Sequence, residues 1–91
     1  MNEHRIKMIR QRLTTAFAPT RLDIVDESHK HAAHAQSGGA GHYLVDIVSD
    51  AFVDKTLMQR HRMVYEALSD AMNTEIHALS IKASTPAEAD G

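Results

Sequence analysis

The chain contains no cysteine and no tryptophan, and its aromatic residues are two phenylalanines and two tyrosines among 91 residues. Without cysteine, disulfides, thiolate nucleophiles and cysteine-based zinc sites are excluded. An iron–sulfur cluster on this chain would need thiolates from another molecule. With so few aromatic residues the core must be aliphatic and small, near the size at which a domain is only marginally stable.

Long apolar runs and a strong charge of one sign are also missing. No run approaches the roughly 18 apolar residues of a membrane span, and the first residues lack the apolar segment of a signal peptide. We therefore expect a cytoplasmic protein that does not bind membranes. Ten basic and twelve acidic residues give a net charge of −2, which excludes a globally basic nucleic-acid binder but not a local basic patch.

An amphipathic helix is predicted at the start of the chain. Its apolar residues follow a period of 3.6, and Pro19 ends it, because the residue before a proline is disfavoured in the α conformation. The predicted inward stripe is Ile6, Ile9, Leu13, Ala16 and Phe17.

A second helix is predicted from Thr56 to about Met72. Thr56 and Gln59 have the spacing of a capping box, which marks its start. A short extra turn is expected before it, around 52–55. The predicted inward stripe of this helix is Leu57, His61, Val64, Leu68 and Met72.

Three strands are predicted from alternating hydrophobicity, at Arg21 to Glu27, His42 to Ser49 and Ile76 to Lys82. A helical crossover between the second and third strands should be right-handed and make them parallel, with the first strand antiparallel to the second. His77 should then lie close to residues 28–41, a loop of glycines, alanines and histidines without periodicity. Residues 1–82 form one predicted domain, and 83–91 a flexible C-terminal tail.

Several separated motifs resemble the BolA family, and they occur in the family's order. They are Asp26 to His31, His42 to Ser49, Phe52, Arg60 to Tyr65 and Ile76 to Leu79. The resemblance implies an α+β fold, a single αββααβ domain of class II KH-like type whose three-stranded mixed sheet has helices packed on one face. One departure is Asp54, which stands where the family usually has a glycine that permits a tight turn.

The resemblance also implies a function. BolA proteins pair with a monothiol glutaredoxin, and the heterocomplex holds a [2Fe–2S] cluster shared with glutathione, for iron–sulfur trafficking or iron regulation. The family's ligand near the start of the last strand corresponds to His77. The loop ligand corresponds to His31 or to His34, and the sequence does not decide between them. Alone, the chain is expected to be a monomer or a weak homodimer, and no enzyme activity is expected.

Two other interpretations remain open. The histidines could simply belong to a polar surface loop. The chain could instead be a DNA-binding transcriptional regulator of morphology or stress response. Arg60 and Arg62, on the solvent side of the second helix, would then form with Lys55 a basic patch that contacts phosphates. A solvated helix face, or part of the glutaredoxin interface, would explain the same residues.

Overall fold

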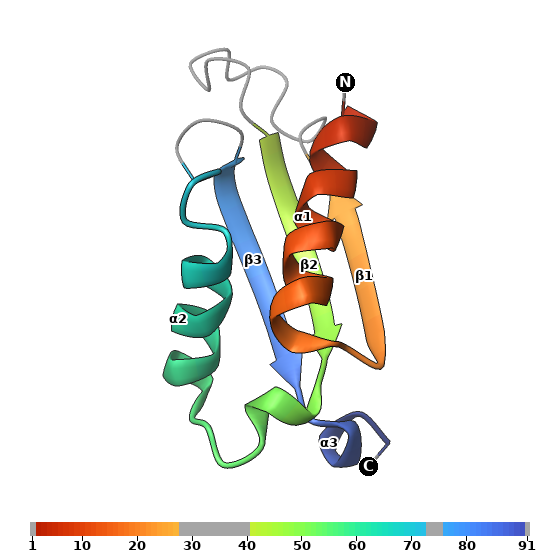
Figure 1. Cartoon of the computed structure of the whole chain (residues 1–91), viewed down its shortest axis with the longest axis vertical. Helices are drawn as coiled ribbons and strands as arrows, with labels where there is room; N and C mark the ends of the chain where they lie inside the picture. The colour runs from red at the N-terminus through yellow and green to blue at the C-terminus, as the bar shows by residue number, and fades with distance from the viewer. Residues whose placement is uncertain (1, 28–40, 73–75, 91) are drawn as a thin grey trace.

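The computed structural model describes residues 2–27, 41–72 and 76–90. Within these residues no helix is both long enough and apolar enough to cross a membrane. The elements follow the predicted order, with one additional helix at the C-terminus (Figure 1). They are α1 (Asn2–Phe17), β1 (Arg21–Asp26), β2 (Gly41–Val48), the 3-10 turn η3 (Asp50–Phe52), α2 (Leu57–Ala67), β3 (Ile76–Ser84) and α3 (Pro86–Asp90).

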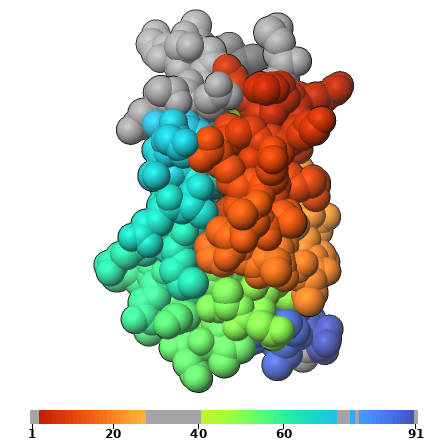
Figure 2. Space-filling view, in the orientation of Figure 1, coloured from red at the N-terminus to blue at the C-terminus, as the bar shows by residue number. Residues whose placement is uncertain are grey.

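The sheet has the order β1-β2-β3. β1 pairs with β2 antiparallel and β2 pairs with β3 parallel, which confirms the predicted topology. α1 and α2 lie on the same face of the sheet (Figure 1), and the space-filling view shows them side by side across that face (Figure 2). The fold is therefore the small α+β domain that the sequence predicts.

The core lies between this helical layer and the sheet. Ile9 and Leu13 of α1 are fully buried, and the Phe17 ring lies 5.1 Å from the Phe52 ring between centroids. Ala16, predicted to face inward, is exposed. The apolar residues that alternate along β2 are all fully buried: Tyr43, Val45 and Ile47.

The helix α2 begins as predicted but presents a different face to the core. Thr56 and Gln59 form the capping box. The helix ends at Ala67 rather than near Met72, and Leu57 is 67% exposed, so it does not belong to the inward stripe. His61 is only half-buried, whereas Arg60 and Val64 are buried. The inward face is thus shifted by one residue in this first turn, because Arg60 finds acceptors inside the fold.

The predicted flexible tail from residue 83 is wrong. β3 continues to Ser84, and α3 follows it at once. Thr85 N donates to Glu88 Oε1 at 2.9 Å, and Glu88 N donates to Thr85 Oγ1 at 3.2 Å, which is a reciprocal cap. The signal was present in the sequence as Thr85, Pro86 and Glu88, a capping box with proline in the first helical position.

Both edges of the sheet carry hydrogen bonds from helix side chains. Successive carbonyls of a strand point to opposite edges. Glu27 N donates to His42 O, so the backbone of Glu27 faces β2 and the carbonyl of Leu22, five residues earlier, points away from β2. Ser84 O accepts from Ser49 N, so the carbonyls of Leu79 and Ala83, five residues and one residue earlier, also point away from β2. These three carbonyls accept from Arg10 at 3.1 Å, Tyr65 at 3.3 Å and Arg60 at 3.1 Å, respectively.

Candidate functional site

The predicted ligand His77 lies where β2 and β3 both begin. Gly41, the first residue of β2, pairs with Ile76, the residue before His77. The backbone therefore places His77 next to the first residue pair of the β2–β3 ladder. The predicted closeness of His77 to the loop before β2 stays a prediction. The candidate loop ligands His31 and His34 lie outside the described residues, so which of them reaches the site stays a prediction.

The pairing of β2 with β3 is irregular at His77. Gly41 pairs with Ile76, but the next residue, His42, pairs with Ala78. His77 is therefore the extra residue of a β-bulge. Bulges interrupt a ladder and change the direction of local side chains, and they occur often beside functional sites.

The described residues do not form a metal site by themselves. Among the side chains that the structure describes, which do not include that of His77, no group of three or more histidine, cysteine, aspartate or glutamate residues is arranged to hold a metal ion.

The basic helix differs from the prediction at Arg60. Its side chain is 8% exposed, so the expectation that it faces solvent is wrong. Nε donates to Lys55 O at 3.0 Å, and Nη1 and Nη2 donate to the two carboxylate oxygens of Glu88 at 2.6 and 3.0 Å. A guanidinium with these acceptors is occupied within the fold and is not presented to a phosphate.

This ion pair perturbs both groups. Hydrogen bonds from Arg60 and then from the Thr85 backbone lower the pKa of Glu88 from 4.5 to about 2. The hydrogen bond to Glu88 raises the pKa of Arg60 further, against the opposing effect of burial. The pair holds α3 against the first turn of α2 over the whole physiological pH range.

Lys55 and Arg62 are exposed, as predicted. Leu57 and Met58 beside them are 67% and 72% exposed. The surface at the start of α2 is thus apolar with two cations, and the predicted basic patch is reduced from three cations to two.

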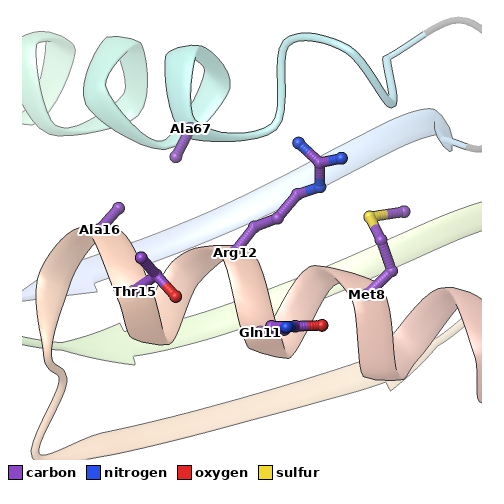
Figure 3. Close-up of a pocket in the computed structure, with 6 residues that line it drawn as sticks. All are labelled: Met8, Gln11, Arg12, Thr15, Ala16 and Ala67. Atoms are coloured by element: carbon purple, nitrogen blue, oxygen red, sulfur yellow. The ribbon is translucent and has the colours of Figure 1, made fainter.

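A groove of about 470 Å³ lies between α1 and α2 (Figure 3). Its lining comes mainly from α1: Met8, Gln11, Arg12, Thr15, Ala16 and, from α2, Ala67. Arg12 forms an ion pair with Asp70, and this contact lowers the pKa of the Asp70 carboxyl. Among the described lining residues, Thr15 carries a hydroxyl, and none is a histidine, aspartate or glutamate that could act as its base.

The comparisons with known proteins agree with the fold. Residues 13–88 match the family model of the BolA-like proteins, and the chain therefore belongs to the BolA family. It is 45% identical over 86 residues to SufE-like protein 1 of Arabidopsis thaliana, covering 88% of this chain and 23% of that protein. It is 37% identical over 83 residues to the DNA-binding transcriptional regulator BolA of Escherichia coli, covering 91% and 77%.

The structures agree as well. The BolA domain of SufE1 from Arabidopsis thaliana superimposes with a TM-score of 0.81 at 44% identity, covering 90% of this chain and 92% of that one. Relatives of this chain therefore occur both as a small protein of similar length and as a part of a much longer one.

Proposed function

We propose that this protein is an adaptor that binds a monothiol glutaredoxin and helps to ligate a [2Fe–2S] cluster through histidines. The observation that supports this most is the bulge at His77, located where β2 begins directly after the histidine-containing segment. The backbone of His77 thus lies at the end of the sheet where the chain enters β2. Membership of the BolA family is the second support.

The residues fit such a site chemically. The chain has no cysteine, so it can offer a cluster only nitrogen or oxygen ligands. Neutral imidazoles can replace two thiolates on one iron of a [2Fe–2S] cluster and raise its potential. The cluster would supply iron and sulfide for transfer, and glutaredoxin and glutathione would supply the thiolates. His77, with His31 or His34, would ligate one iron of the cluster and so stabilise the heterocomplex.

The test is an anaerobic mixing experiment. The protein is added to a monothiol glutaredoxin that carries its [2Fe–2S] cluster, and visible absorption and circular dichroism are followed. We expect a new spectrum that saturates at a ratio of one to one, is lost in His77→Ala and is kept in His61→Ala. His61 is the matched control, because it is a half-buried histidine of α2. An unchanged spectrum on mixing, or equal spectra for His77→Ala and the natural protein, would reject the proposal.

A second candidate function is DNA binding, which the name of the Escherichia coli relative supports. The exposed cations at the start of α2, Lys55 and Arg62, are the residues that could contact phosphates. Two such contacts would give weak binding with a shallow salt dependence. The test is the binding of a labelled duplex, which should weaken in Lys55→Ala and Arg62→Ala and with added salt. Absence of binding at low ionic strength would exclude this function.

A further inference from the structure

The bulge at His77 is built into the packing of the sheet. Side chains alternate between the two faces of a strand with a period of two. Leu79 pairs with the buried Tyr43 and lies against the core, so Ile76, three residues earlier, would face the opposite side in a regular strand. Ile76 is nevertheless fully buried in the core. The extra residue, His77, is what allows both Ile76 and Leu79 to face inward.

The start of β3 is anchored on its other side as well. Ile76 N donates to Ala71 O at 3.1 Å, and Met72 forms a parallel bridge with Ile76. The chain just before the bulge is therefore tied to the turn that follows α2. The position of the bulge also depends on β2, the strand that pairs with β3 there.

Gly41 and Tyr43 of β2 supply that constraint. The Tyr43 ring lies so close to Gly41 that a methyl group at Gly41 would be 2.5 Å from Cε2 and Oη and 2.6 Å from Cζ. Contacts this short require something to shift. Tyr43 is fully buried in the same core cluster as Ile76, so its ring has little room to move. The backbone of Gly41, the partner of Ile76, is thus held under a buried aromatic ring.

We infer that Gly41 and Tyr43 are positioning residues for His77. The ring on Gly41 fixes the first pair of the parallel ladder, Gly41 with Ile76, and thereby fixes the bulge at the following residue of β3. The inference rests on the proposed role of His77 for its functional meaning. The structural relationship between these residues can be tested without any cluster.

The first measurement uses the 15N-labelled protein alone. In Gly41→Ala we expect the amide resonances of His77 and Ala78 to shift, because the new methyl group must displace either the ring or the β2 backbone. Val64→Ala is the control, since Val64 is a fully buried core residue of α2. It should lower stability and leave these two resonances in place. Unmoved His77 and Ala78 resonances in Gly41→Ala would overturn the inference.

A double-mutant cycle identifies the ring as the cause. With Tyr43→Leu as background, the added methyl group has no ring to meet. Gly41→Ala should then produce little further change at His77 beyond that of Tyr43→Leu alone. An effect of Gly41→Ala that is equal in both backgrounds would contradict the inference. This cycle also applies if Gly41→Ala does not fold by itself, because the double variant and Tyr43→Leu can be compared directly. Equal His77 and Ala78 resonances in those two variants support the ring's role, and a further shift in the double variant overturns it.

The second measurement uses the complex with cluster-loaded glutaredoxin. Gly41→Ala should release the cluster about tenfold faster, as expected when a group that orients a metal ligand is lost. The outcomes separate the two proposals. Shifted His77 resonances without any cluster spectrum in the natural protein would reject the adaptor function and keep the positioning relationship. A cluster spectrum that requires His77 but is unchanged in Gly41→Ala would keep the adaptor function and reject the positioning role of Gly41.

Discussion

Arg60 and Glu88, which are 28 residues apart in the sequence, form a bidentate ion pair with Nη1–Oε1 and Nη2–Oε2 distances of 2.6 and 3.0 Å. The same guanidinium donates to Lys55 O before α2 and to Ala83 O at the end of β3. One side chain thus connects the start of α2, the end of β3 and α3. Its role in this structure is to hold those elements together.

The first prediction concerns Arg60. Arg60→Met keeps the apolar stem but removes the donors to two backbone carbonyls and to Glu88, and should destabilise the protein by about 1–3 kcal/mol. Arg62→Met is the matched control, because Arg62 is exposed and should change stability by less than about 0.5 kcal/mol. Urea unfolding of the two variants measures the difference. Equal losses of stability would show that the buried contacts of Arg60 contribute nothing.

The second prediction concerns pH. The pKa of Glu88 is lowered from 4.5 to about 2 by Arg60 and by the Thr85 backbone. A lowered carboxyl pKa favours the folded state above the ordinary pKa, and this contribution is lost as pH falls from about 4.5 to about 2. Carboxyl carbon shifts should show Glu88 titrating near 2, and Glu88→Gln should remove this part of the acid sensitivity. A Glu88 titration near 4.5 would contradict the ion pair.

The third prediction concerns the face of the sheet opposite to α1 and α2. Asp23 of β1 lies directly across from Asp46 of β2, and Arg21 bridges them at 3.2 and 2.8 Å. Like charges in such a pair destabilise a sheet. Arg21→Gln should therefore lower stability by about 0.5–1 kcal/mol at low salt, because it leaves two carboxylates facing each other. Adding Asp23→Asn should recover most of the loss, as should high salt, in thermal unfolding. A loss independent of salt would point to packing instead of charge.

The fourth prediction concerns Asp54, which has a φ of 64° in the turn before α2. The resemblance described in the sequence analysis implies a glycine at this position, and an aspartate tolerates the left-handed region better than most residues. Asp54→Gly should stabilise the protein by about 0.5 kcal/mol, and Asp54→Val should destabilise it by about 1 kcal/mol.

Lys55→Gly is the control for Asp54. Lys55 belongs to the same turn, but its φ is not positive. Glycine at this position should therefore lower stability through the greater freedom of the unfolded chain. Stabilisation by glycine at both positions would contradict the explanation based on φ.

Local signals in the sequence predicted most of the fold. The stripe through Ile9 and Leu13, the alternation from Tyr43 to Ile47 and the capping box of Thr56 each depend on residues close together in the chain, and each is confirmed. The parallel pairing of β2 with β3 followed from the helical crossover predicted between them. Membership of the BolA family followed from the order of the motifs.

The errors have a common physical cause. Arg60 was placed in solvent because its partner Glu88 is distant in sequence, and a charged residue is buried only where a partner compensates its desolvation. Leu57 fits the 3.6-residue period of the inward stripe, but this period does not show where along the helix the core ends. The bulge at His77 depends on how Ile76 packs in the finished core, and no pattern within β3 alone indicates it.

The hydrogen bonds from Arg10, Tyr65 and Arg60 to the outward carbonyls of the edge strands have a consequence for how this domain can be used in larger proteins. Unpaired edge strands invite pairing with any extended segment held nearby. A segment tethered to this domain as part of a longer polypeptide would find three of those acceptors already occupied. The occupied acceptors therefore favour a sheet that stays three-stranded when the domain is part of a longer polypeptide.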